Sequence, residues 1–295
     1  MRTVLIGARG QLGTELRALL PPDTLALDLP EFDVQREAEV RAALQAHGAE
    51  LVINCAAQTN VDLCENEPEA AFAINALGAR TVARCAAELG AAVIYISTDY
   101  VFGADTERSA AYAEHDVPGP INVYGASKWA GEALTLACNR QALVVRTCGL
   151  YGRAGARGKG GNFVETMLRL AGAGQPVRVV NDQRVSPTAA AELAVRLCAL
   201  VAKRVDGVYH VAAPDSCTWF EFAQAIFAHE KVDADLRPVN SAEYPVRARR
   251  PAFSALCTLR LERAGVPPCR PWREMLDEYL CQRAVPAWTG EEQPT

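Results

Sequence analysis

The chain starts with a short apolar run that leads directly into a glycine-rich turn and then into a segment of helical periodicity. The apolar run is Thr3–Ile6, and the helical pattern covers Gln11–Leu20. Glycines let the backbone approach an anion closely, and the N-terminus of a helix offers N–H groups and a partial positive charge. The order strand, glycine turn, helix predicts a dinucleotide-binding site. The residues predicted to form it are Gly7, Gly10, Gln11, Leu12 and Gly13.

Apolar runs and helical segments alternate through the first half of the chain. Apolar runs without polar alternation are typical of strands buried on both faces of a parallel sheet, and helices between them indicate a doubly wound α/β fold. The sequence therefore predicts a Rossmann-like parallel sheet. Its predicted strands are Thr3–Ile6, Thr24–Leu29, Leu51–Cys55, Ala92–Ser97 and Ala142–Thr147, and its predicted helices are Gln11–Leu20, Arg36–His47, Glu69–Leu89 and Asn122–Cys138.

The second half of the chain differs in composition and in its pattern of elements, which indicates a smaller, interleaved lobe. A glycine- and arginine-rich segment follows residue 150, and the last third is rich in proline. The helical pattern of 189–202 and the apolar run of 207–213 indicate a return to the first domain. We therefore expect an NAD(P)-binding domain made of residues 1–150 and about 189–215, a substrate-binding lobe made of 151–188 and 216–285, and a flexible tail at 286–295.

Composition excludes several classes of protein. In 295 residues, 30 Lys and Arg stand against 35 Asp and Glu, and this net charge of -5 does not suggest nucleic-acid binding. Apolar runs fall short of the roughly 20 residues of a membrane span, and the N-terminus does not read as a signal peptide, so we expect a cytoplasmic protein without membrane contact. The ten cysteines and four histidines show neither a C-x-x-C pair nor metal-ligand spacing, so no metal site is assigned.

The strongest chemical signal is the string Tyr124-Gly-Ala-Ser-Lys128. Positions i and i+4 lie on one face of a helix, so the phenol and the ammonium are expected to project together. An ammonium beside a phenol stabilises the phenolate, which predicts a lowered tyrosine pKa suited to proton transfer. Thr98 ends the preceding apolar strand and supplies a hydroxyl that can hold a reacting carbonyl oxygen. The sequence thus predicts Thr98, Tyr124 and Lys128 as catalytic residues, and Lys128 is one of only four lysines in the chain.

The form of the nicotinamide cofactor is left open by two residues with opposite effects. Asp28 lies about twenty residues beyond the glycines, where a carboxylate can accept hydrogen bonds from the adenosine ribose and disfavour a 2′-phosphate. Arg9, inside the glycine turn, favours that phosphate. Either NADH or NADPH is therefore compatible with the sequence.

Over nearly its whole length the chain resembles the dTDP-4-dehydrorhamnose reductases, a family within the extended short-chain dehydrogenases/reductases. The two most specific strings are Ser97-Thr-Asp-Tyr-Val-Phe102 and Ala248-Arg-Arg-Pro251, because generic sugar-nucleotide epimerases and dehydratases differ after the catalytic threonine. The other carriers of the resemblance are Gly7–Gly13, Ala56–Asp62 with Glu65 and Pro68, Asn75, Pro120–Lys128 with Gly131 and Glu132, Arg146-Thr147, Gly161-Asn-Phe163 with Met167, Asn181-Asp-Gln183, and Pro187-Thr188.

The resemblance implies reduction of the 4-keto group of a nucleotide-linked 6-deoxyhexose for cell-surface polysaccharide synthesis. Tyr124 would protonate the sugar O4 as hydride leaves the nicotinamide, and Lys128 would also hold the nicotinamide ribose. Ala56, Ala57 and Thr59 would line the cofactor beside the glycines. The residues implied to shape the sugar pocket are Val61, Asp99 and Tyr100.

Three features depart from the family pattern or leave choices open. Gly149 stands in a segment where the family usually has a substrate-contacting tryptophan. Arg153, Arg157 and Lys159 could reach the substrate diphosphate or lie in a mobile solvated loop. Some family members dimerise through a metal, and Glu15 and Glu192 hold plausible positions for Mg²⁺, although both also suit exposed helix faces.

Two other functions stay open at the level of sequence. One is a non-catalytic nucleotide-binding subunit that resembles the regulatory subunit of methionine adenosyltransferase. The other is a nucleotide-sugar epimerase or dehydratase, which Asp99-Tyr100 after Thr98 disfavours because similar dehydratases carry an Asp-Glu pair there. The expected partners are a nucleotide-sugar substrate and a second copy in a homodimer.

Overall fold

The computed structural model describes residues 1–154, 161–244 and 246–283. The elements up to residue 147 are β1 (Thr3–Ile6), α1 (Gln11–Leu19), β2 (Leu25–Leu27), α2 (Glu37–His47), β3 (Leu51–Asn54), α3 (Val61–Asn66), α4 (Pro68–Phe72), a π-helical turn (Ala73–Gly78), α5 (Ala79–Glu88), β4 (Ala92–Thr98), a 3₁₀ turn (Asp99–Val101), α6 (Val123–Cys138) and β5 (Ala142–Thr147). The later elements are β6 (Leu150–Tyr151), α7 (Phe163–Gly172), β7 (Val177–Val180), β8 (Arg184–Val185), β9 (Thr188–Ala189), α8 (Ala190–Lys203), β10 (Gly207–His210), β11 (Cys217–Thr218), α9 (Trp219–Glu230), β12 (Leu236–Val239), a 3₁₀ turn (Ser241–Glu243), α10 (Leu259–Arg263) and α11 (Trp272–Gln282).

The central sheet confirms the predicted doubly wound α/β fold. Within the described residues it has six strands in the order β10-β5-β4-β3-β1-β2, and all neighbouring pairs are parallel. Parallel strands require crossover connections, which the helices between them supply. The carboxyl ends of all six strands therefore meet at one edge, where ligands of such folds bind.

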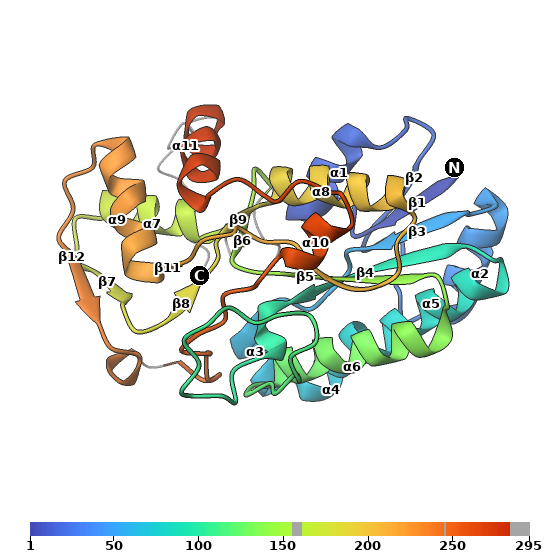
Figure 1. Ribbon diagram of the computed structural model, residues 1–295, viewed down its shortest axis with the longest axis horizontal. Helices are drawn as coiled ribbons and strands as arrows, with labels where there is room; N and C mark the ends of the chain where they lie inside the picture. The colour runs from blue at the N-terminus through green and yellow to red at the C-terminus, as the bar shows by residue number, and fades with distance from the viewer. Residues whose placement is uncertain (155–160, 245, 284–295) are drawn as a thin grey trace.

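Helices cover both faces of this sheet (Figure 1). On one face α1 and α8 pack over a core that includes Leu5, Ile53 and Leu143, and on the other α2 and α5 pack over Val4 and Val52. Helix α6 packs against α5 and against β4 and β5. Strands β1, β3 and β5 are buried along their whole length, which explains the apolar runs in the sequence.

The predicted helix Glu69–Leu89 is interrupted by the π-helical turn Ala73–Gly78. Asn75 lies in this turn, and its buried side chain donates to the Ser127 hydroxyl (2.9 Å) and exchanges hydrogen bonds with the backbone of Gln58. The apolar periodicity of the sequence could not reveal this π-helical turn. Its Asn75 side chain bonds to Gln58 and Ser127, which are distant along the chain. Such turns are frequent at functional sites.

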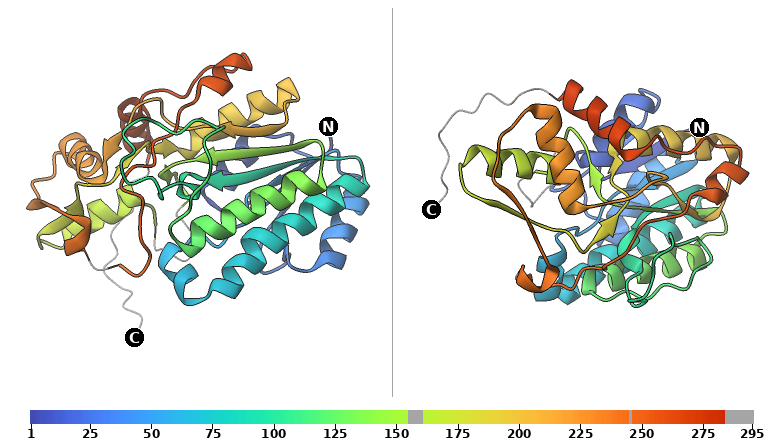
Figure 2. Two further views of the ribbon diagram at one scale, coloured as in Figure 1. Left: turned by 60° about the horizontal axis from the view of Figure 1, so that its bottom comes forward. Right: turned by 60° about the vertical axis from the view of Figure 1, so that its left-hand side comes forward.

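Strand β10 extends the sheet by pairing in parallel with β5, and α8, which precedes β10 in the chain, packs against α1. Helices α7 and α9 and strands β7, β8, β11 and β12 lie together at one end of the molecule, beyond the carboxyl ends of the central strands (Figures 1 and 2). The exact domain boundaries stay a prediction, and the expected tail 286–295 lies outside the described residues. No helix in the described ranges is long and apolar enough to cross a membrane.

Candidate active site

A cavity of about 890 Å³ opens at the carboxyl edge of the central sheet, between that sheet and the end group of α7, α9 and β7. The residues that the sequence assigned to the cofactor, to catalysis and to the sugar pocket lie in its wall, whereas Arg9, considered for a 2′-phosphate, is not among them. The assigned residues in the wall are Gly7, Gly10, Gln11, Leu12, Gly13, Asp28, Ala56, Ala57, Thr59, Val61, Thr98, Asp99, Tyr100, Tyr124 and Lys128. The fold therefore brings together side chains that the sequence spreads over 122 positions.

The glycine turn forms a cradle in which side chains have no room. Gly7 adopts a φ of +77°, and a Cβ there would lie 2.9 Å from the backbone nitrogen of Ala56. A Cβ on Gly13 would overlap the carbonyl oxygen of Gly7. Helix α1 starts at Gln11 without a side-chain cap among the described residues, so its first N–H groups are available to an anion. This geometry fits the pyrophosphate of a dinucleotide.

At the end of β2, Asp28 and Arg9 are held by neighbouring groups. Asp28 accepts hydrogen bonds from the backbone nitrogens of Arg9 (2.6 Å) and Leu29 (2.8 Å). The Arg9 guanidinium donates to Glu31 (2.7 Å) and to the Leu29 carbonyl (3.2 Å). Arg9 is thus drawn to an acidic neighbour at the corner where the adenosine ribose of a dinucleotide would lie.

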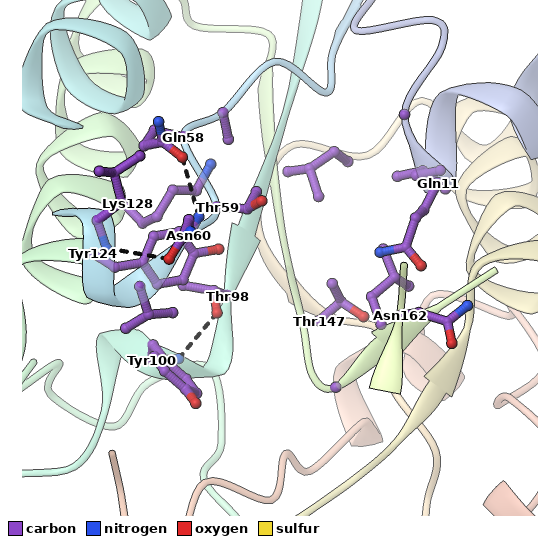
Figure 3. A pocket seen from close by; sticks show the side chains of 18 of the residues that line it. Gln11, Gln58, Thr59, Asn60, Thr98, Tyr100, Tyr124, Lys128, Thr147 and Asn162 are labelled. Carbon is purple, nitrogen blue, oxygen red and sulfur yellow. Dashed lines mark hydrogen bonds between the residues drawn. The ribbon is translucent and has the colours of Figure 1, made fainter. Parts of the chain in front are cut away.

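Thr98, Tyr124 and Lys128 lie together on one side of the cavity (Figure 3). Thr98 is the last residue of β4, and its hydroxyl accepts from the Tyr100 backbone nitrogen (3.2 Å) and donates to Asp99 (3.1 Å). Helix α6 carries the other two residues and begins at a cap, since Asn122 accepts from the Gly125 nitrogen at 2.7 Å. The Tyr100 ring meets the Tyr124 ring edge-on at a centroid distance of 5.8 Å.

The pKa of Tyr124 is shifted upward, which corrects the lowered pKa expected from the sequence. Burial raises the pKa of Tyr124 well above its usual value, and the neighbouring Thr98 hydroxyl only partly opposes this. Burial also lowers the pKa of Lys128 to about 7, against the opposing charge of Glu132. Burial is the largest influence on both groups, because desolvation disfavours the phenolate and the ammonium alike. Tyr124 is therefore a neutral phenol, a proton donor.

Asp99 is more enclosed than a residue that simply faces substrate. Its carboxylate accepts hydrogen bonds from Ser254 (2.5 Å), Cys148 (3.1 Å) and Thr98 (3.1 Å), and burial raises its pKa despite these three donors. Only 3% of Asp99 is exposed. The carboxylate thus joins the ends of β4 and β5 to the segment that contains Ser254.

The opposite side of the cavity presents Gln11, Thr147 and Asn162 (Figure 3). Thr147 ends β5 directly beside Thr98 in the sheet register. Its hydroxyl oxygen and the Gln11 amide oxygen are buried and have no hydrogen-bond partner among the described residues. Unpartnered buried polar atoms are costly, so both atoms are suited to a polar ligand in the cavity.

The later part of the chain adds cavity residues to which the sequence assigned no role. Arg250 forms an ion pair with Asp62 at 2.7 Å, and this contact ties its segment to α3. The strings at 161–163, 181–183 and 248–251 carried the resemblance and could have drawn attention to three of these residues, Phe163, Gln183 and Arg250. The added residues include Phe163, Arg178, Gln183, Trp219, Tyr244 and Arg250.

Trp219 lies beside the position where the family tryptophan was expected. A Cβ on Gly149 would meet the Trp219 ring at 3.4 Å, and the ring packs on Phe163 at a centroid distance of 4.6 Å. The cavity wall therefore has an aromatic surface next to Gly149, although it comes from α9.

The two glutamates considered for Mg²⁺ are bound by arginines. Arg153 binds Glu15 through two nitrogens (3.0 and 2.6 Å), and Glu192 is paired with Arg196 (2.5 Å) and Arg270 (3.0 Å). Both glutamates are buried, so the alternative of exposed helix faces is wrong. Across the described residues, groups of three or more potential metal ligands are absent.

Arg153 was also expected to contact the substrate diphosphate. In the structure its guanidinium is paired with Glu15 instead. The other two residues of that expectation, Arg157 and Lys159, lie outside the described residues. We therefore assign no residue of the segment 153–159 to the substrate diphosphate.

Comparison with known proteins shows which family the chain belongs to. The family model of the RmlD substrate binding domain matches residues 1–285. The dTDP-4-dehydrorhamnose reductase of Mycolicibacterium smegmatis is 41% identical, covering 95% of this chain and 85% of its own, and the spore coat polysaccharide biosynthesis protein SpsK of Bacillus subtilis is 37% identical, covering 96% and 98%. The crystal structure of dTDP-4-dehydrorhamnose reductase from Bacillus anthracis in complex with NADP superimposes with a TM-score of 0.90 at 38% identity, covering 95% and 98%. The chain therefore belongs to the dTDP-4-dehydrorhamnose reductase family, as its motifs predicted.

Proposed function

We propose that this protein reduces the 4-keto group of a nucleotide-linked 6-deoxyhexose with NADH or NADPH, converting dTDP-4-dehydro-L-rhamnose to dTDP-L-rhamnose for cell-surface polysaccharide. The observation that carries the proposal is the presence of Thr98, Tyr124 and Lys128 in the same cavity as the glycine cradle. A proton donor, a cation and a hydroxyl beside a nicotinamide site are the groups that carbonyl reduction needs. Family membership supports the same reaction.

In this proposal the bound nicotinamide supplies the hydride. Tyr124 donates its phenolic proton to the sugar O4, and its raised pKa keeps it protonated until that step. The Lys128 ammonium stabilises the phenolate that Tyr124 becomes and also holds the nicotinamide ribose. The Thr98 hydroxyl holds the reacting oxygen.

The remaining residues of the cavity divide by position. Those proposed to hold the cofactor are Gly7, Gly10, Gln11, Leu12, Gly13, Asp28, Ala56, Ala57 and Thr59. Val61, Asp99 and Tyr100 shape the sugar site, and Trp219 gives the substrate an aromatic surface. The proposed cofactor domain comprises residues 1–150 and about 189–215, supported by the pairing of β10 with β5. The reaction is expected in the cytoplasm of the cell, with the protein as a homodimer, which light scattering would measure.

The test is turnover of dTDP-4-dehydro-L-rhamnose by the purified protein, followed as oxidation of NADH and NADPH in parallel. Tyr124→Phe removes the proton donor and is expected to lower kcat by roughly 10²- to 10⁴-fold. Tyr112→Phe is the matched control, because the Tyr112 hydroxyl is buried outside the cavity and has no partner in the described ranges. Wild-type activity in Tyr124→Phe would contradict the mechanism.

The same assay separates the other two functions. A regulatory subunit would bind cofactor and co-purify with a partner enzyme without turning over any 4-keto nucleotide sugar. An epimerase or dehydratase would retain oxidised cofactor through turnover, whereas a reductase consumes one reduced cofactor for each sugar.

A further inference from the structure

The ammonium of Lys128 lies over the face of the Tyr95 ring, 4.0 Å from its centroid. Tyr95 lies on β4 and Lys128 on α6, and both are almost fully buried, at 1% and 2% exposure. We propose that Tyr95 is a positioning residue whose ring face holds the Lys128 ammonium in place and keeps it charged. This inference rests on the proposed function for its catalytic meaning, but the contact itself can be tested without turnover.

The Tyr95 ring is fixed at its far end. Its hydroxyl donates to the carbonyl oxygen of Asn75 at 2.7 Å, inside the π-helical turn. Gly131 on α6 makes room for that hydroxyl, since a Cβ at residue 131 would overlap both the Tyr95 hydroxyl and the Asn75 carbonyl oxygen. Ala79 and Val144 pack against the ring. The ring therefore cannot follow the lysine if the ammonium moves.

The surroundings of the ammonium explain why a ring face matters there. Among the described residues, the ionisable groups that act on it are Glu132 on its own helix and Cys55 after β3, and Tyr124 lies one helical turn before it on α6. Glu132 is already engaged by two nitrogens of Arg146 and by the Ser97 hydroxyl, so its charge is shared. Burial favours neutral Lys128. The negative face of an aromatic ring attracts only the charged form, and this attraction is strongest when the cation is desolvated.

The consequence for the reaction follows from the role of Lys128. A neutral amine would not stabilise the phenolate that remains after Tyr124 has given up its proton. Because burial brings the pKa of Lys128 down to about 7, a modest further fall would leave the amine neutral under ordinary conditions. The Tyr95 ring opposes that fall.

Lysine NMR tests the contact directly in the intact protein. Protein labelled with [ε-¹³C]lysine contains four labelled residues, and the Lys128→Met variant identifies the signal of Lys128. The pH titration of that signal is compared in wild type, Tyr95→Phe and Tyr95→Leu. Tyr95→Phe keeps the ring and is expected to leave the pKa of Lys128 unchanged, whereas Tyr95→Leu is expected to lower it by about one pH unit or more.

Val144→Ala is the matched control for a defect in packing. Val144 pairs with Tyr95 in the sheet and belongs to the same buried cluster, yet its loss leaves the ring in place. It should lower thermal stability without changing the Lys128 titration. An unchanged titration in Tyr95→Leu, or an equal fall in Tyr95→Phe, would overturn the proposal.

The pH profile of kcat then connects the contact to the reaction. Activity that needs charged Lys128 falls as pH rises through the pKa of Lys128. Tyr95→Leu should therefore move this fall in kcat to lower pH. The difference in kcat between Tyr95→Leu and wild type should become smaller in more acidic solution. A deficit in kcat that is the same at every pH would overturn the positioning role. If wild type shows no turnover while the NMR titrations behave as expected, the proposed function fails and the contact between Tyr95 and Lys128 stands.

Discussion

Arg146 on β5 and Glu132 on α6 form a buried ion pair with two hydrogen bonds, Nε to Oε1 at 2.9 Å and Nη2 to Oε2 at 2.7 Å. Their side chains are 4% and 3% exposed. The Ser97 hydroxyl donates to the same carboxylate at 2.5 Å. The pair ties the helix that carries Tyr124 and Lys128 to the two strands whose ends border the cavity.

Removing one partner of this pair is expected to be costly, because the other charge stays buried and unpaired. Arg146→Met should lower the free energy of unfolding by about 3–5 kcal/mol, measured by urea denaturation. The double variant Arg146→Met/Glu132→Leu replaces both charges by apolar groups and should recover much of that loss. An exposed ion pair contributes up to about 1 kcal/mol. If Arg146→Met lowered the free energy of unfolding by no more than this, the buried pair would not hold α6 in place.

His210 predicts a dependence of stability on pH. Its Nδ1 faces the carbonyl oxygens of Tyr112 (3.0 Å) and Cys257 (3.2 Å), and its Nε2 faces Arg146 (3.4 Å). Nδ1 therefore carries the proton, and Nε2 accepts from the guanidinium. Burial, followed by the charge of Arg146, lowers the pKa of His210 from 6.5 to about 3.

The sign of this effect follows from proton binding. Below pH 6.5 the unfolded chain binds a proton at His210 that the folded protein excludes, so this part of stability is complete above pH 6.5 and is lost as pH falls toward 3. The slope should reach about 1.4 kcal/mol per pH unit. Urea denaturation between pH 7 and 5 measures it. His210→Asn should flatten the slope, whereas His115→Asn, at an exposed histidine, should not. Equal slopes in wild type and His210→Asn would refute the assignment.

The ion pair of Arg9 with Glu31 predicts a change in cofactor preference. Glu31→Gln removes a negative charge at the corner where the adenosine ribose would lie and releases the guanidinium toward a 2′-phosphate. The ratio of kcat/KM for NADPH to that for NADH should rise by up to about fivefold, the range of an exposed pair. Steady-state kinetics with both cofactors measure this ratio, with Glu107→Gln, an exposed acid outside the cavity, as the control. A ratio that stays level or falls in Glu31→Gln would contradict the prediction.

Trp219 predicts an effect on substrate alone. Trp219→Leu removes the aromatic surface beside Gly149 and should raise the KM for the nucleotide sugar by about tenfold while leaving the KM for the cofactor unchanged. Trp219→Phe keeps a smaller ring and should lie between this variant and wild type. Thermal unfolding checks that α9 is still packed, and an equal rise in both KM values would indicate a general defect instead of a substrate contact.

The sequence by itself determined the parts of the protein that depend on neighbours in the chain. The strand, glycine turn and helix at residues 3–20 predicted the dinucleotide cradle, and the spacing of Tyr124 and Lys128 put both groups on one face of a helix. Apolar runs predicted the parallel sheet, because strands buried on both faces carry apolar residues at every position.

Only the tertiary structure decided the environment of these groups. The direction in which the pKa of Tyr124 shifts depends on burial, and burial depends on segments far along the chain. The ring of Tyr95 under Lys128, the pairing of Glu15 with Arg153 and the place of Trp219 beside Gly149 each join residues at least 33 positions apart. Local spacing constrains which side chains share one element, whereas desolvation and pairing between elements are set by packing.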